Sequence, residues 1–343
     1  MRTASVLVVS AAISLLACSS DGTPTQPDSN GEPVPAALPS YSQAPNTWAP
    51  RAPLPQIEQS GVSAGVVTTA AGRSTVYTFG GIEPTEGGVD WPVQAYDVST
   101  DKWTVKASVT HGVRLNGVAK IGGRLYYSGG YITHVQEYSN QLLAYDYTND
   151  RLIPKRGIPY YSADGITGAI DGKLYVLPGT CSGDYWPNSG FCDPEAFRKL
   201  YRYDPSTNSW AKMGWSPHFH RRGAGGVING KFYVAAGFDQ NHLRTASLDE
   251  YDPGTNTWRT RAPMPAGSDW AYGAVLNNKL YVVASTTAGL ATYAYSPGTN
   301  SWANKAAPKY AGHSALVPVS LGGRNYLFAV GGGSQVPNEL YAP

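Results

Sequence analysis

The segment His218-Phe219-His220 holds the most closely spaced pair of histidines in the sequence. In an extended chain, residues two apart point to the same side, so both imidazoles would face one direction. Neutral imidazole is a ligand of zinc and copper, but no third ligand stands at a recognisable spacing. We therefore predict no metal and no cofactor, while metal binding near His218 and His220 stays open.

Charged and aromatic residues stand just ahead of several apolar, alternating segments, and one tryptophan belongs to a long polar loop. Arginine presents a planar fork of donors that can hold a carboxylate bidentately, and a tryptophan ring offers a flat apolar surface. This combination suits a sugar, above all a carboxylated one, although a solvated rim with local ion pairs is the alternative. The candidate ligand-binding residues are Asp164, Trp186, His220, Arg222, Asp269, Trp270 and His313. No catalytic residue can be assigned.

An internal repeat supplies the elements that must position these side chains. In each copy a tyrosine is followed seven residues later by a tryptophan, with leucine replacing it once, and Tyr341 begins another copy. The residues between them, such as Asp204-Pro205-Ser206-Thr207-Asn208, form a tight turn between two strands. The copies are Tyr41…Trp48, Tyr96…Trp103, Tyr145…Leu152, Tyr203…Trp210, Tyr251…Trp258 and Tyr295…Trp302.

A second hairpin lies midway between successive copies. It consists of an apolar strand, a two-residue turn such as Asn229-Gly230 or Asp171-Gly172, and a second strand with a central aromatic residue. Asn-Gly and Asp-Gly are strong hairpin signals, because both central residues take positive φ. Gly-Gly pairs follow at 80–81, 129–130 and 331–332. Each unit therefore holds four antiparallel strands, which we name a to d.

These elements, in this order, resemble the kelch repeat over nearly all of residues 41–343. The resemblance implies an all-β fold, a six-bladed β-propeller of four-stranded kelch-type blades. The N-terminal part supplies only strand d, and the C-terminal part supplies a, b and c. We therefore expect the ring to close by pairing of the N- and C-terminal strands, which removes an exposed sheet edge.

Alternating strand direction places the short a–b and c–d turns on one face and the longer b–c and d–a loops on the other. Rigid scaffolds present function on loops, so we expect a glycan or protein ligand on the long-loop face. The kelch resemblance also includes a periplasmic sialic-acid epimerase. The alternative is therefore a carbohydrate-active enzyme of epimerase or lyase type, with its site at the mouth of the central channel.

The N-terminal segment predicts export. An apolar run over residues 4–17 is too short to span a bilayer and indicates a signal peptide over 1–17. Leu15-Leu16-Ala17-Cys18 resembles a bacterial lipobox, which implies that Cys18 is acylated. We expect the protein to be lipid-anchored in the bacterial cell envelope, at the outer membrane or the cell surface. Residues 18–40 would be the lipidated cysteine and a flexible linker.

The remaining cysteines, Cys181 and Cys192, fall in one polar, Gly-rich loop. Because disulfides persist in exported proteins, we predict that they pair, with two separate buried thiols as the alternative. The formal net charge of +2 and the absence of any Lys/Arg cluster give no reason to propose nucleic acid as a partner. We expect a monomer whose membrane contact is limited to its lipid anchor.

Overall fold

A computed structural model describes residues 41–55, 61–81, 90–111, 113–114, 117–132, 137–180 and 197–343. Cys18, Cys181, Trp186 and Cys192 lie outside these ranges, so the predicted acylation, disulfide and Trp186 contact stay predictions. Everything described belongs to one compact unit that covers residues 39–343. No helix in the described part of the chain is long and apolar enough to cross a membrane.

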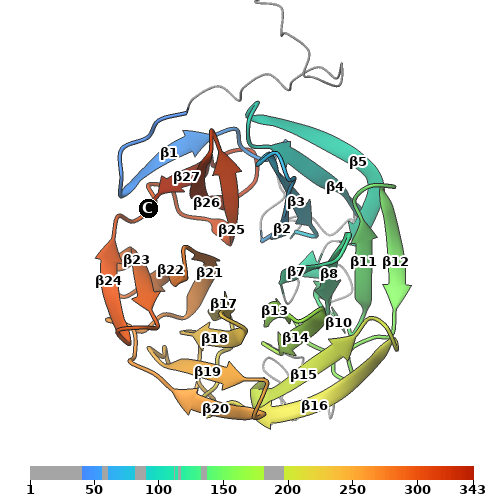
Figure 1. Ribbon diagram of the computed structural model, residues 1–343, viewed down its shortest axis with the longest axis vertical. Coiled ribbons are helices and arrows are strands. Elements are labelled where there is room, and N and C mark those ends of the chain that lie inside the picture. Colours follow the sequence, from blue (N-terminus) through green and yellow to red (C-terminus); the bar gives the residue numbers. More distant parts are fainter. Residues whose placement is uncertain are drawn as a thin grey trace, which may run out of the picture. The chain divides into compact units, whose positions relative to one another are not determined.

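Six four-stranded antiparallel sheets form the blades, arranged around a common centre (Figure 1). From the inner to the outer strand, blade 1 consists of β2 (Ser63–Thr68), β3 (Ser74–Phe79), β4 (Asp90–Asp97) and β5 (Lys102–His111). Blade 2 consists of β7 (Val118–Ile121), β8 (Arg124–Ser128), β11 (Leu142–Asp146) and β12 (Arg151–Lys155). Blade 3 consists of β13 (Ile166–Ile170), β14 (Lys173–Leu177), β15 (Lys199–Asp204) and β16 (Ser209–Trp215).

The second half of the ring continues in the same order. Blade 4 consists of β17 (Ala224–Ile228), β18 (Lys231–Ala235), β19 (Leu248–Asp252) and β20 (Thr257–Thr260). Blade 5 consists of β21 (Trp270–Leu276), β22 (Lys279–Thr286), β23 (Gly289–Ser296) and β24 (Ser301–Lys305). Blade 6 consists of β25 (His313–Leu321), β26 (Arg324–Gly331), β27 (Asn338–Ala342) and β1 (Thr47–Arg51).

Blade 6 closes the ring as predicted, because its outer strand comes from the opposite end of the sequence. Strand β1 pairs antiparallel with β27, from Thr47 opposite Ala342 to Arg51 opposite Asn338. The six inner strands contact one another in a complete cycle, β2–β7–β13–β17–β21–β25 and back to β2. A small additional sheet, β10 (Glu137–Tyr138), β9 (Tyr131–Ile132) and β6 (Val113–Arg114), was not predicted.

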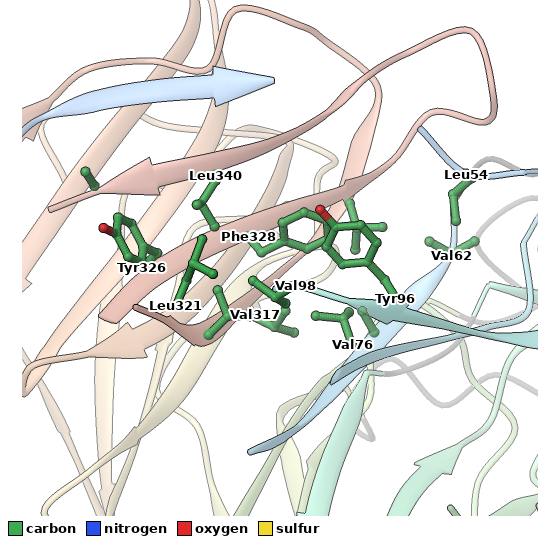
Figure 2. Close-up of a cluster of buried hydrophobic side chains, with 14 residues drawn as sticks. Leu54, Val62, Val76, Tyr96, Val98, Val317, Leu321, Tyr326, Phe328 and Leu340 are labelled. Carbon is green, nitrogen blue, oxygen red and sulfur yellow. The ribbon is translucent and has the colours of Figure 1, made fainter. Parts of the chain in front are cut away.

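Apolar side chains of neighbouring blades fill the space between the sheets. Between blades 6 and 1, Tyr96 of β4 stacks on Phe328 of β26 with ring centroids 4.7 Å apart (Figure 2). Val76, Val317 and Leu340 belong to the same buried cluster. Burial of such side chains stabilises a fold by about 1.5–3 kcal/mol each, so the blade-to-blade contacts hold the ring together.

The repeat tyrosine of every blade makes the same hydrogen bond. Its hydroxyl donates to an Asn or Asp side chain in the c–d turn, over 2.5 to 2.9 Å. Each of these turn residues has positive φ, which Asn and Asp tolerate better than most residues. The pairs are Tyr96–Asp101, Tyr145–Asp150, Tyr203–Asn208, Tyr251–Asn256, Tyr295–Asn300 and Tyr341–Asn46.

The same turn side chain also accepts a backbone N–H from the end of the preceding blade, over 2.8 to 3.0 Å. We call the tyrosine, the turn Asn or Asp, and this amide the blade latch. It occurs at all six junctions, with amides from Ala52, Ala107, Arg156, Gly214, Ala262 and Ala306. The turn Asn or Asp, which the sequence indicated as part of a hairpin, thus also joins each blade to its neighbour.

Candidate functional site

The inner strands of all six blades begin around one shallow cavity, which we call the central mouth. Its volume is ≈ 150 Å³. The segments that line it are 61–64, 117–118, 164–167, 222–225, 270–273 and 314–316. Each segment lies where a d–a loop passes into strand a, so the cavity opens on the long-loop face.

Three of the predicted ligand-binding residues meet at the central mouth. Nε of Arg222 donates to Oδ2 of Asp164 over 3.4 Å, and the hydroxyl of Thr180 donates to the same oxygen over 3.2 Å. The Arg222 guanidinium carbon lies 5.2 Å from the centre of the Trp270 ring. A guanidinium over an aromatic face is attracted by the ring quadrupole. Carboxylate, guanidinium and indole therefore form one connected group.

The backbone around these residues is fixed by contacts between successive blades. Asp164 and Arg222 both have positive φ, 55° and 57°. The Arg222 N–H donates to the Asp164 carbonyl over 3.2 Å, and the Ala271 N–H donates to the Arg222 carbonyl over 3.0 Å. The three d–a loops are thus linked in series, so the side chains of blades 3, 4 and 5 are held in register at the mouth.

The other described candidates lie elsewhere. His220 and His313 have fully buried side chains and do not line the central mouth. Asp269 precedes Trp270 but forms an ion pair with Arg244, at 2.7 Å. Of the predicted set, the structure therefore brings together Asp164, Arg222 and Trp270, and separates His220, Asp269 and His313 from them.

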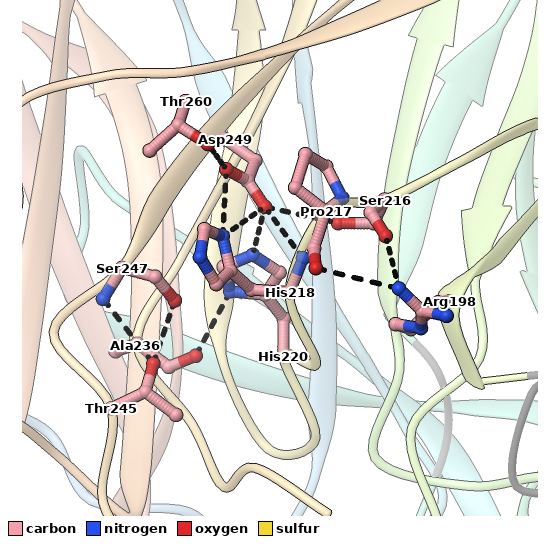
Figure 3. Close-up of polar contacts among 10 residues, drawn as sticks. All are labelled: Arg198, Ser216, Pro217, His218, His220, Ala236, Thr245, Ser247, Asp249 and Thr260. Atoms are coloured by element: carbon pink, nitrogen blue, oxygen red, sulfur yellow. Dashed lines mark hydrogen bonds and ion pairs between the residues drawn. The ribbon is translucent and has the colours of Figure 1, made fainter.

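A buried carboxylate, Asp249 of β19, collects the polar groups of the loop between blades 3 and 4 (Figure 3). Nδ1 of His218 lies 3.0 Å and Nε2 of His220 lies 3.1 Å from its Oδ2. The Ser216 hydroxyl donates to the same oxygen over 3.1 Å, and the Thr260 hydroxyl donates to Oδ1 over 3.0 Å. Burial raises the pKa of Asp249, but the hydrogen bonds and charges of the two imidazoles outweigh it and lower the pKa to about 2.

The hydrogen bonds of His220 define its protonation state. Nδ1 lies 3.0 Å from the Ala236 carbonyl oxygen, and Nε2 faces the Asp249 carboxylate. Both oxygens can only accept, so each ring nitrogen must carry a proton. His220 is therefore an imidazolium that balances the buried charge of Asp249. His218 needs a proton only on Nδ1, which leaves its Nε2 as an acceptor.

A second cavity, of ≈ 410 Å³, lies beside His218, and we call it the blade-4 pocket. The b–c loop of blade 4 and the d–a loop ahead of it form its walls. Residues that line it include Arg198, Pro217, His218, Asp239, Arg244 and Ser247. The His218 side chain is 45% exposed, so one imidazole is anchored on a buried carboxylate while it faces a cavity.

Blade 6 carries a carboxylate at the equivalent position, Glu339 of β27. Its two oxygens accept the backbone N–H groups of Lys309 and Tyr310, each over 3.0 Å. Nδ1 of His313 lies 3.9 Å from it, too far for a hydrogen bond, and Nε2 faces the Pro337 carbonyl at 3.0 Å. Burial is the largest influence on His313 and lowers its pKa.

No group of three or more His, Cys, Asp or Glu within the described ranges is arranged to hold a metal ion. His218 and His220 do approach a common atom, as their spacing suggested, but that atom is a carboxylate oxygen of Asp249. The two histidines therefore form a hydrogen-bonded cluster around a buried carboxylate, with His220 buried and His218 partly exposed.

Sequence reasoning did not identify Asp249. Residues two apart in a strand share a face, and Asp249 stands two before the buried Tyr251. An Asp at this position therefore predicts a buried carboxylate. The residues there in blades 1, 2, 3 and 5 are Gln94, Leu143, Tyr201 and Tyr293.

Comparison with known proteins supports the class that the blades and their repeat define. The Kelch motif family model matches residues 221–265, which cover blade 4. With six four-stranded blades, the chain is a kelch-repeat β-propeller, as its sequence indicated. A solved structure titled "Structure of YjhT" matches with a TM-score of 0.63 and 19% identity, over 84% of this chain and 95% of that chain. At this identity the likeness concerns the fold.

Proposed function

We propose that this propeller binds a glycan that carries a carboxylate, with the central mouth as the binding site. The observation that carries the proposal is the convergence of Asp164, Arg222 and Trp270, from three consecutive blades, on one cavity. Arg222 supplies positive charge, Asp164 can accept from hydroxyls, and the indole offers an apolar surface to a sugar ring.

The polar side chains of the mouth are held in place before a ligand binds. The side chains of Arg222 and Asp164 are only 17% and 8% exposed, and Thr180 also bonds the carboxylate. A site whose groups are already held in place loses little conformational entropy when a ligand binds. We therefore expect the mouth to bind without rearrangement of the backbone.

The protein would act at the cell envelope, if Cys18 is acylated as its surroundings predict. An anchored propeller could then present its long-loop face to glycans. The alternative is an epimerase or lyase, which needs an acid or base at the same site, and Asp164 is the carboxylate available there. Product analysis distinguishes the two functions.

The test begins with a glycan array, followed by calorimetry on each acidic glycan that binds. We expect Arg222→Lys and Trp270→Ala each to weaken binding tenfold or more, about 1.4 kcal/mol. Trp215→Ala is the matched control, because Trp215 is 46% exposed and lies outside the mouth. Binding that survives both mouth variants would refute the site. Conversion of a bound glycan, detected by mass spectrometry and NMR, would favour the enzyme.

A further inference from the structure

We propose that the blade-4 pocket is a second ligand site, which binds a hydroxylated organic anion with Nε2 of His218 accepting from a ligand hydroxyl. This site is separate from the central mouth. The residues that line the two cavities do not overlap.

The first argument is the orientation of His218. Its Nδ1 lies 3.1 and 3.0 Å from the two oxygens of Asp249, and its backbone N–H donates to the same carboxylate over 3.1 Å. The ring is thus fixed by two contacts to a side chain that is itself fully buried. Nε2 has no hydrogen-bond partner among the described residues, although the side chain is nearly half exposed and lines the cavity.

The second argument is the tautomer that the contacts of His218 favour. Nδ1 faces the two oxygens of Asp249, which can only accept, so the neutral ring carries its proton on Nδ1. A neutral imidazole in this tautomer presents a lone pair at Nε2. The partner of such a lone pair is a hydrogen-bond donor, and a ligand hydroxyl can supply it.

The third argument is the arrangement of cations around the pocket. Arg198 and Arg244 both line it, and the Arg198 guanidinium lies 5.3 Å from the centre of the Phe219 ring. Arg244 also pairs with Asp269. The Asp239 carboxylate lines the cavity too, but its Oδ1 accepts the N–H groups of Asn241 and Leu243 within its own turn. Asp239 and Asp269 balance the two positive charges, but a guanidinium group offers a planar fork of donors that can hold a ligand carboxylate.

The pocket volume of ≈ 410 Å³ leaves room for a single sugar-acid unit, whereas a long oligosaccharide would extend into solvent. A uronic acid combines the required carboxylate with several hydroxyls.

The test measures modification of His218 in the full-length protein by diethyl pyrocarbonate, which reacts with accessible imidazole nitrogens. Galacturonate, glucuronate and gluconate are the probes, and galactose and glucose are the neutral controls. We expect the acids to slow carbethoxylation of His218 tenfold, measured by peptide mass spectrometry. His242 is exposed on the b–c loop of blade 4 but does not line the pocket, so it is the internal control and should keep its rate.

Two variants sharpen the result. Arg244→Gln leaves the contacts of His218 with Asp249 in place and should reduce protection by the acids at least fivefold. Arg222 lines the central mouth and not the blade-4 pocket, so Arg222→Lys should leave protection of His218 unchanged and failure of one site is distinguishable from failure of the other. If no acid protects His218, or if galactose protects equally, the proposal is wrong.

Discussion

Blades 4 and 6 carry a carboxylate at the same place in strand c, two residues before the repeat tyrosine, yet they use it differently. Glu339 accepts two backbone N–H groups and completes the loop that leads into β25. Asp249 instead accepts from two imidazoles and leaves one of them facing a cavity. One position of the repeat can therefore close a loop or orient a side chain towards a cavity, depending on which donors the d–a loop supplies.

The comparison predicts that the loss of Asp249 is the most damaging single change. Asp249→Ala would leave the His220 imidazolium buried without its counter-charge. Breaking a buried ion pair in this way costs about 3–5 kcal/mol, and we expect that loss in the free energy of unfolding, measured by chemical denaturation. A loss below about 1 kcal/mol would mean that the carboxylate is no more important than a surface charge.

Acid should affect blade 4 through the same group. The folded pKa of Asp249, about 2, lies below its ordinary value of 3.8, so the stability it contributes is present above pH 4 and is lost as the pH falls towards 2. The shift corresponds to about 2.5 kcal/mol. We expect the difference in unfolding free energy between wild type and Asp249→Asn to shrink over this range. A difference that is independent of pH would contradict the buried ion pair.

The smallest effect should come from blade 6. Glu339→Gln replaces one accepting oxygen by an NH₂ group, so one of the two loop amides loses its partner. An unsatisfied donor costs about 1–3 kcal/mol, and we expect the lower end, because Lys309 is exposed and water can reach the loop. Thermal unfolding of the variant checks this. A loss equal to that of Asp249→Ala would show that the two carboxylates are equivalent after all.

The architecture could be predicted from the sequence because the same hairpin signals recur in each repeat unit. The Tyr…Trp spacing and the Asn-Gly turns fix the strands, and the split last repeat predicts the closure that β1 and β27 make. The blade latch was less visible. A turn Asn was expected for its positive φ, but its second bond, to the amide of another blade, depends on how the blades are placed in space.

The candidate site was predictable only in part. Asp164, Arg222 and Trp270 follow from their place ahead of strand a, because every strand a begins at the mouth. The sequence could not show that His220, two residues before Arg222, points into the blade, since the d–a loop is irregular and does not follow a strand period. The partner that draws His220 inward, Asp249, lies 29 residues away along the chain.

The pairing of β1 with β27 closes the ring and is expected to control how fast the ring unfolds. Adjacent blades are joined by covalent chain, but β1 is held in blade 6 by its ladder to β27, by the latch that Asn46 forms with Tyr341 and Ala306, and by the Trp48–Tyr341 ring contact. The ring can thus open with every other strand still in its blade only if β1 detaches from β27. Detachment of β1 would then limit the rate of global unfolding. Amide hydrogens of the inner strands that exchange only through global unfolding would then exchange no faster than β1 detaches, however far from it they lie.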